Sequence, residues 1–239
     1  MKFAVKQLAA ALILGIATCA ANAGVISVQF GQTPDSLKNP SQTGAAALGN
    51  ANDLWNRFTG GTGKGNSLLD TSGQASGVTL DFASSHLYSA DPSYYAFAGT
   101  SLAGLMQGYL VGDAGQVGGI TMTLGGLTPG QAYDLLVYTQ GDNNSKGRSI
   151  QIDANGVVQA SLQSNANTLA LNDNYVRLTV TADGKGQINV IGTTLRGEGN
   201  INGFQLEPVD VPEPGAPALL LLGAVALAVA RWRKQGSSR

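Results

Sequence analysis

The clearest structural signal in this chain is Ser149-Ile150-Gln151-Ile152-Asp153-Ala154-Asn155-Gly156-Val157-Val158-Gln159-Ala160-Ser161-Leu162. Apolar and polar side chains alternate in its first run, as they do along a strand with one buried face. Asn-Gly fits the tight turn of a two-residue β-hairpin, because both residues adopt positive φ readily. The segment therefore predicts two antiparallel strands, 149–153 and 157–162, joined by a turn.

Short alternating runs of the same kind lie on both sides of this hairpin. They occupy residues 25–30, 77–82, 120–124, 132–138, 175–181, 187–191 and 201–206. The turn sequence at 183–186, Asp-Gly-Lys-Gly, separates two of these runs and predicts a second hairpin. Many short strands between turn residues are typical of an antiparallel sandwich. We therefore expect an all-β fold, a single antiparallel β-sandwich or jelly roll.

Two segments depart from the alternating pattern. Residues 101–110 place apolar side chains at helical spacing and predict one helix, which Gly104 and Gly108 weaken. Residues 31–76 are rich in Gly, Ser, Thr and Asn and are expected to form long loops over a sheet, with short strands at most. Within them, residues 60–65 imitate a phosphate-binding loop without its required spacing, so we expect a flexible turn there.

The composition excludes several classes of protein. The chain has 239 residues, of which only 12% are charged, against about 25% in typical soluble domains. This scarcity of charge excludes a coiled coil, and the 43% hydrophobic content excludes a highly charged disordered chain. The net charge of −1 offers no basic surface for nucleic acid. Residues 24–210 alone contain eight Lys or Arg and fourteen Asp or Glu, so the body carries a charge of −6.

The first 23 residues have the layout of a secretory signal. Lysines precede an apolar stretch at 8–17, and Ala21-Asn22-Ala23 forms a small-x-small cleavage site. We expect export by the Sec machinery and cleavage between Ala23 and Gly24. The alternatives are an uncleaved helical anchor and a lipoprotein acylated on Cys19. Cys19 is the only cysteine, so cleavage would leave a mature chain with neither a disulfide nor a thiol.

The C-terminal end has three consecutive features. Residues 208–217 form a proline-rich linker that contains Pro212-Glu213-Pro214, residues 218–230 are uninterruptedly apolar, and residues 231–239 begin with Arg-Trp-Arg-Lys. The apolar run predicts a short transmembrane helix. The basic residues predict a cytoplasmic tail, because positive charge is retained on that side. A simple tail anchor with a stiff stalk is the alternative.

This layout resembles the PEP-CTERM sorting signal of exported proteins from Gram-negative bacteria that make extracellular polysaccharide. The resemblance implies recognition by an exosortase and processing near Pro212, Glu213 and Pro214. It also implies transient residence in the inner membrane before release to the cell surface or the extracellular space. The same tail is known as an ice-binding protein C-terminal domain. Only two threonine pairs, Thr121 with Thr123 and Thr179 with Thr181, would support ice binding by the body.

Residues 24–207 resemble a galactose-binding-like jelly roll in several short motifs. These are Gly-Leu-Thr-Pro-Gly before a Tyr-bearing strand at 126–135, together with residues 67–70, 141–142 and 201–206. The resemblance implies one β-sandwich domain between the signal peptide and the linker. It also implies a structural Ca²⁺, since such domains often hold one.

Oxygen-rich and aromatic segments supply the candidate binding residues of the body. The loop from Asp142 to Gly147 offers Asp142 and Asn144 as ligands for Ca²⁺, and a solvated turn is the alternative. A second loop places Tyr88, Tyr94 and Tyr95 beside Asp91, a composition suited to contact with a glycan, because sugar rings stack on aromatic faces. Packing of these tyrosines in the core is the alternative. No other cofactor is expected.

Few residues point to catalysis. His86 is the only histidine, and no serine in the chain lies in a nucleophile motif with which it could form a catalytic triad. We therefore expect His86 in a surface loop. Paired carboxylates could hydrolyse glycosides. The candidates are Asp70, Asp81, Asp91, Asp113, Asp134, Asp142, Asp153 and Asp173. Nothing in the sequence selects a pair among them.

The function expected from these observations is that of a non-enzymatic, exported protein of the cell surface or extracellular matrix. Its candidate partners are an exosortase and an extracellular polysaccharide. A secreted carbohydrate-active enzyme and a purely structural interaction module are the two alternatives.

Overall fold

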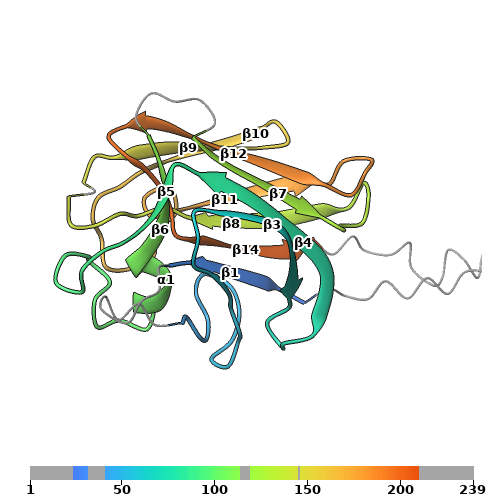
Figure 1. Ribbon diagram of the computed structural model, residues 1–239, viewed down its shortest axis with the longest axis horizontal. Helices are drawn as coiled ribbons and strands as arrows, with labels where there is room; N and C mark the ends of the chain where they lie inside the picture. The colour runs from blue at the N-terminus through green and yellow to red at the C-terminus, as the bar shows by residue number, and fades with distance from the viewer. Residues whose placement is uncertain (1–23, 32–40, 114–118, 145, 210–239) are drawn as a thin grey trace, which may run out of the picture. The chain divides into compact units, whose positions relative to one another are not determined.

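The computed structural model describes residues 24–31, 41–113, 119–144 and 146–209 (Figure 1). Its strands form two large sheets and one small sheet. The five-stranded sheet has the order β11-β8-β14-β1-β2, the six-stranded sheet β10-β9-β12-β7-β4-β3, and the three-stranded sheet β13-β6-β5. Their bounds are β1 Ile26–Phe30, β2 Asn56–Phe58, β3 Thr62–Leu69, β4 Ala75–Ser84, β5 His86–Ser89, β6 Gly108–Gly112, β7 Ile120–Gly125, β8 Ala132–Tyr138, β9 Ser149–Ala154, β10 Val157–Leu162, β11 Tyr175–Thr181, β12 Ile188–Arg196, β13 Gly199–Ile201 and β14 Gly203–Pro208.

The all-β prediction is confirmed, and the Asn-Gly hairpin forms as expected. Strands β9 and β10 pair antiparallel, with Ala154 opposite Val157 across a two-residue turn. Asn155 and Gly156 have φ of 48° and 86°, the positive values that such a turn requires. The side-chain amide of Asn155 also donates to the carbonyls of Thr181 and Gln187, so this turn is tied to the neighbouring connection.

The second predicted hairpin is wrong. Strand β11 pairs with β8 in one large sheet, whereas β12 pairs with β7 and β9 in the other. Residues 183–186 do form a tight turn, in which the Asp183 carboxylate accepts from the backbone of Lys185 and Gln187. The turn therefore crosses from sheet to sheet, because both strands bury one face and those faces meet inside the sandwich.

The helix in the structure is shorter than the one predicted at residues 101–110. Helix α1 spans only Ala103–Gln107, and the chain enters β6 at Gly108. All five residues of β6 are buried, since this strand pairs with β5 on one side and β13 on the other. Tertiary pairing thus overrides a weak helical pattern that contains two glycines.

The expectation of long loops at 31–76 is also wrong in part. Strand β3 has eight residues and pairs antiparallel with β4, so the glycine-rich 60–65 segment begins an edge strand and is no flexible turn. Two register shifts interrupt this pairing, the first between Gly63 and Asn66. Residues 41–55, by contrast, form turns and bridges on the sheet surface, as predicted.

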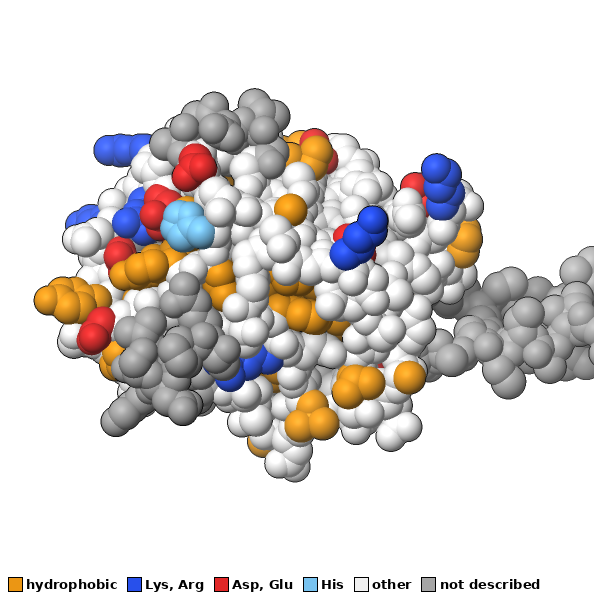
Figure 2. Space-filling view, viewed as in Figure 1, with side chains coloured by type: hydrophobic (Ala, Val, Ile, Leu, Met, Phe, Trp, Pro, Cys, Tyr) orange, Lys and Arg blue, Asp and Glu red, His pale blue; other side chains and the backbone are white. Residues whose placement is uncertain are grey.

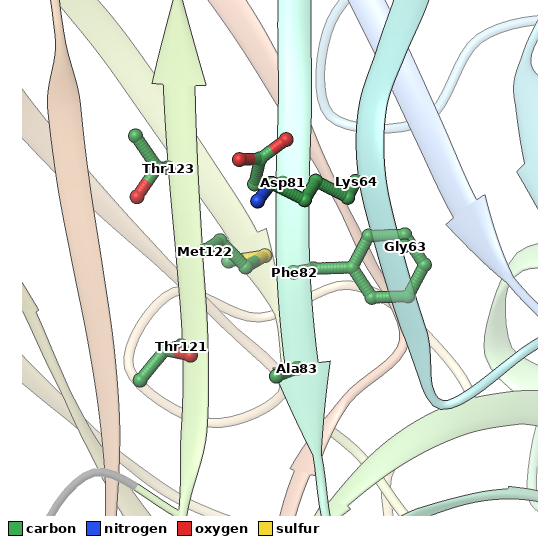
Figure 3. A pocket seen from close by; sticks show the side chains of 8 residues that line it. All are labelled: Gly63, Lys64, Asp81, Phe82, Ala83, Thr121, Met122 and Thr123. Carbon is green, nitrogen blue, oxygen red and sulfur yellow. The ribbon is translucent and has the colours of Figure 1, made fainter.

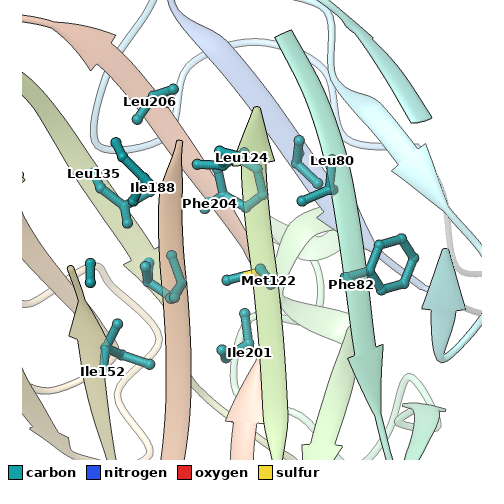
Figure 4. Packing of buried hydrophobic residues seen from close by; sticks show 14 of the residues in the cluster. Leu80, Phe82, Met122, Leu124, Leu135, Ile152, Ile188, Ile201, Phe204 and Leu206 are labelled. Carbon is teal, nitrogen blue, oxygen red and sulfur yellow. The ribbon is translucent and has the colours of Figure 1, made fainter. Parts of the chain in front are cut away.

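The main core lies between the two large sheets (Figure 4). Alternate residues of each strand point into it, which is the pattern that the sequence predicted. They include Leu80, Phe82, Met122, Leu124, Leu135, Ile152, Ile188, Phe204 and Leu206, all at most 5% exposed. Phe82 packs against Phe30 and Phe58, with ring centroids 5.0 and 5.4 Å away.

The outer face of the five-stranded sheet is covered by loops that buried amides hold in place. Gln205 on β14 binds Tyr138 and Ser27, together with the backbone of Leu48. Gln29 on β1 donates to the carbonyl of Gly104 and accepts from the backbone of residue 42. Polar positions of these strands are therefore as buried as apolar ones.

Candidate functional site

Two connections, β8–β9 and β12–β13, and strand β13 bring a cluster of charged and polar side chains together at one end of the sheets. Arg148, just before β9, donates from Nη1 to Glu198 Oε1 at 3.0 Å, and its Nη2 lies 3.3 Å from Asp142 Oδ1. Asn200 Nδ2 donates to the same Glu198 oxygen at 2.8 Å. We call these four residues the Arg148 cluster. The Arg148 side chain is 17% exposed and those of Asp142 and Glu198 are 20% and 35% exposed, so solvent reaches the cluster.

The backbone at Gly141 approaches this cluster too closely for any other residue. A Cβ atom there would lie 2.5 Å from Arg148 Nη1 and 2.9 Å from Asn200 Oδ1. Glycine at this position therefore leaves the space that the Arg148 guanidinium occupies. The amide of Gly141 also donates to Gln163 Oε1, which connects this backbone to the segment after β10.

Two tyrosines lie beside the Arg148 cluster on neighbouring strands. Tyr109 on β6 is only 1% exposed, and burial raises the pKa of its hydroxyl, with Asp142 and Glu198 adding to the rise. Tyr88 on β5 is 41% exposed and lies opposite Tyr109 in the register, with ring centroids 5.4 Å apart. The Tyr88 ring thus offers a solvent-facing surface on a rigid support.

The predicted glycan-contact residues divide between surface and core. Tyr94 is 62% exposed, and its carbonyl accepts from the amide of Asn143, which links its loop to that of Asp142. Asp91 is exposed, and hydrogen bonds from Ser93 hold its pKa below the usual value. Tyr95 is the exception, because it is 6% exposed and packs in a second core cluster. Tyr95 is therefore removed from the candidate contacts, while Tyr88 and Tyr94 stay.

The Ca²⁺ candidates engage protein partners. Asp142 Oδ1 pairs with Arg148 and accepts from the backbone amide of Asn144 at 3.1 Å. Among the described residues, no group of three or more His, Cys, Asp or Glu side chains is placed to hold a metal ion. A cation near Asp142 would have to share its carboxylate with the guanidinium.

His86 lies at the first position of β5, where a surface loop was expected. Its ring is exposed on the same strand face as Tyr88, and Nδ1 lies 3.2 Å from the Ser85 hydroxyl. Figure 2 shows the histidine at one end of the body, beside acidic and basic side chains. It is a surface residue near the Arg148 cluster, and within the described residues its ring bonds to no carboxylate.

A shallow groove lies on the outer face of the six-stranded sheet, away from these loops. Strands β3, β4 and β7 line its volume of about 180 Å³ with Gly63, Lys64, Asp81, Phe82, Ala83, Thr121, Met122 and Thr123 (Figure 3). Asp81 and Ala83 alternate with Phe82 along β4, so Asp81, Ala83, Thr121 and Thr123 face outward, whereas Phe82 and Met122 point into the core.

Three of the candidate aspartates are held in the charged form. A hydrogen bond from the Ser72 hydroxyl lowers the pKa of Asp70, and Ser93 does the same for Asp91. Burial raises the pKa of Asp134, but hydrogen bonds from Arg177 and Thr179 outweigh it and keep that pKa low. A general acid in glycoside hydrolysis needs the opposite shift.

The targeting segments lie outside the described residues, so the signal cleavage site at Ala23, the sorting motif at 212–214 and the predicted helix at 218–230 have no structural account. In the part of the chain that the structure describes, no helix is both long and apolar enough to cross a bilayer. A protein-family model described as the PEP-CTERM protein-sorting motif matches residues 210–234. The predicted sorting motif is thereby confirmed at the C-terminus, and it supports export and sorting by an exosortase.

Solved structures show a distant likeness to the body, while no curated protein matches the chain. A β-glucuronidase from Bacteroides uniformis shares 15% identity at a TM-score of 0.45, over 78% of this chain and 18% of that one. The extracellular domain of ANXUR2 from Arabidopsis thaliana shares 15% at 0.40, over 77% and 41%. An exo-β-1,3-galactanase from Phanerochaete chrysosporium shares 13% at 0.33, over 58% and 32%. This chain spans less than half of each, and likeness at this level carries no inference about activity.

Sequence reasoning missed Arg148, Glu198 and Tyr109 as site residues. Arg148 and Glu198 are 50 positions apart, and each lies in a glycine-rich connection with no motif of its own. The rarity of glutamate, with three in the chain, was the one available signal. It marks Glu198 as unusual without indicating a partner.

Proposed function

We propose that this protein is a non-enzymatic component of the cell surface or extracellular matrix that binds polysaccharide at the Arg148 cluster. The carrying observation is that the charged, solvent-reached cluster connects to two exposed tyrosines. Tyr88 packs on Tyr109, whose hydroxyl bonds Arg148. The Tyr94 carbonyl accepts from the amide of Asn143, next to Asp142. Export and sorting supply the location, since the PEP-CTERM motif is found at residues 210–234.

The chemistry of the cluster suits sugar hydroxyls. Within the described part of the chain, both contacts of Glu198 use Oε1, which leaves Oε2 to accept a hydrogen bond from a ligand. Arg148 has five N–H donors; its ion pairs use Nη1 and Nη2, and it also bonds the Tyr109 hydroxyl. A sugar ring stacked on Tyr88 would present its hydroxyls to the acceptor Glu198 and the donor Arg148. A preorganised site of this type loses little entropy on binding.

The carboxylates support binding better than hydrolysis. Asp142 and Glu198 both pair with one guanidinium, so this network engages both carboxylates of the cluster. The pKa values of Asp70, Asp91 and Asp134 are lowered, whereas a glycosidase needs one carboxyl that stays protonated. The galactose-binding-like architecture expected from the sequence motifs fits this proposal, because such a domain binds with its loops.

The test is native affinity electrophoresis of the exported protein in gels that contain exopolysaccharide from its host. Tyr88→Ala and Tyr94→Ala should each reduce the retardation by removing a stacking face. Leu162→Ala is the matched control, since Leu162 is 59% exposed on β10 and lies outside the cluster. Its retardation should equal that of the unchanged protein.

A parallel incubation with the same polysaccharide separates the alternatives. Binding without new reducing ends supports the proposal, whereas release of reducing ends would establish the carbohydrate-active enzyme instead. A protein that neither binds nor cleaves would be a structural interaction module, and the proposal would be wrong.

A further inference from the structure

Asp70 presents a carboxylate oxygen to the backbone at Gly24, where the mature chain is expected to begin. A Cβ atom on Gly24 would lie 3.5 Å from Asp70 Oδ2. The nitrogen of Gly24 is bonded to the same Cα as that Cβ position, so it lies within about 6 Å of Oδ2. Among the described residues, the ion pairs do not include Asp70, and its side-chain hydrogen bonds all use Oδ1.

The turn that follows β3 needs only Oδ1 of Asp70. This atom accepts from the backbone amides two and four residues later, both at 2.9 Å, and from the Ser72 hydroxyl at 2.6 Å. The turn at 183–186 has the same arrangement, in which Asp183 Oδ1 lies 2.8 and 2.9 Å from the amides two and four residues later. One carboxylate oxygen is therefore enough for this kind of turn, and Oδ2 of Asp70 is available for another contact.

The backbone next to Gly24 is fixed beside this carboxylate. Thr71 donates from its amide to the carbonyl of Val25 at 2.9 Å, and its own carbonyl accepts from the amide of Leu54. Strand β1 begins one residue after Val25, is buried throughout and pairs with β14 and β2. Gly24 itself is exposed and has no side chain, so its amino end can rotate toward Asp70 without displacing β1.

Cleavage between Ala23 and Gly24 changes the charge at this position. Hydrolysis of the peptide bond consumes one water and leaves a carboxylate on Ala23 and an amine on Gly24. An α-amino group has an ordinary pKa of about 7.7–8.0, so near pH 7 most of it is protonated. Before cleavage the same nitrogen is an uncharged amide. Asp70 is an anion under these conditions, because the hydrogen bond from the Ser72 hydroxyl lowers its pKa.

We propose that signal cleavage creates an ion pair between the α-ammonium group of Gly24 and Oδ2 of Asp70, which ties the mature N-terminus to the turn between β3 and β4. The inference rests on cleavage after Ala23 and is independent of polysaccharide binding. The pair joins a strand of the five-stranded sheet to the hairpin at the edge of the six-stranded sheet. The precursor lacks this ammonium group, so the stabilisation appears only after cleavage.

The first test compares Asp70→Asn with Asp183→Asn in the exported protein, once intact-mass measurement has established that the chain begins at Gly24. Both substitutions remove a charge from the same kind of turn and keep an Oδ1 acceptor, and only Asp70 lies against Gly24. A carboxylate partner raises the pKa of the α-amino group in the folded state. The stabilisation should therefore be fully present below about pH 7 and be lost as the pH rises toward about 9.5.

Urea denaturation at about pH 6 and about pH 9.5 measures this difference. For an exposed ion pair, the factor by which Asp70→Asn increases the unfolding equilibrium constant should be about two- to fivefold larger at the lower pH. The factor for Asp183→Asn should be the same at both pH values.

The unchanged protein supplies a second measurement, which decides the question if Asp70→Asn fails to fold. Reductive methylation with ¹³C labels the α-amino group, and NMR then gives its pKa in the folded protein and in a peptide of residues 24–28. The pKa should be higher in the protein, and about 1 M salt should reduce the difference by screening the pair.

Three results would overturn the inference. An α-amino pKa in the protein no higher than that of the peptide would show that no pair forms. Equal factors for Asp70→Asn at the two pH values would show that its carboxylate acts only within its turn. A mature chain that begins at another residue would place the ammonium group away from Asp70. None of these results bears on the Arg148 cluster, so failure here is distinguishable from failure of the proposed function.

Discussion

Replacing Gln205 by methionine should destabilise the body strongly, although glutamine is a polar residue that the alternating pattern would place in solvent. Gln205 is fully buried, and its amide makes four hydrogen bonds. Oε1 accepts from Tyr138 at 2.6 Å and from Leu48 N at 3.0 Å, while Nε2 donates to Ser27 Oγ at 3.0 Å and to Leu48 O at 3.1 Å. Methionine has a similar shape and can replace none of them.

The magnitude follows from the groups left behind. Each buried donor or acceptor that loses its partner costs about 1–3 kcal/mol, and water reaching the loop at Leu48 recovers part of this. We therefore expect the free energy of unfolding to fall by about 3–5 kcal/mol. For a domain of this size, each kcal/mol lowers Tm by roughly 2–4 °C, so Tm should drop by about 10 °C or more.

The assay is urea denaturation of the exported protein beside its Gln159→Met counterpart. Gln159 is exposed on the edge strand β10, so the same chemical change there should alter the free energy of unfolding by less than about 0.5 kcal/mol. Equal slopes against urea would show that the denatured states are comparable. A loss below about 1 kcal/mol for Gln205→Met, or one equal to that of the control, would refute the idea that this amide holds the covering loop.

Three further predictions follow from the charges and the targeting segments. Hydrogen bonds from Arg177 and Thr179 keep the pKa of Asp134 low in the folded state, so its stabilising effect should be present above about pH 4 and be lost as pH falls further. Asp134→Asn should flatten that part of a curve of stability against pH, and an unchanged curve would contradict this. Intact-mass measurement of the exported protein should show a chain that begins at Gly24, whereas a species retaining an acylated Cys19 would establish a lipoprotein. Alanine replacement of residues 212–214 should leave membrane insertion intact and abolish processing in a host with an exosortase, so the precursor should accumulate in the inner membrane; unchanged migration and distribution would reduce the tail to a simple anchor.

The sequence by itself determined many of the body's strands, although it predicted neither β3 nor β5 and β6. Alternation predicted β8 and β11 at their observed bounds, and Asn-Gly predicted the turn between β9 and β10. It also identified the sorting motif, which matches at residues 210–234. These features are local, since alternation reports burial of one strand face and turn chemistry reports the backbone of two or four residues.

Only the tertiary structure decided which strands pair and which polar residues meet. Alternation in β11 and β12 shows that each buries one face, but it is identical for neighbours in one sheet and for strands facing each other across a sandwich. Gln205 follows the polar period of β14 and is nevertheless buried, because a loop more than 150 residues earlier covers it. Arg148 meets Glu198 across 50 residues for the same reason. Such contacts depend on how the sheets and loops pack, and no local period encodes that packing.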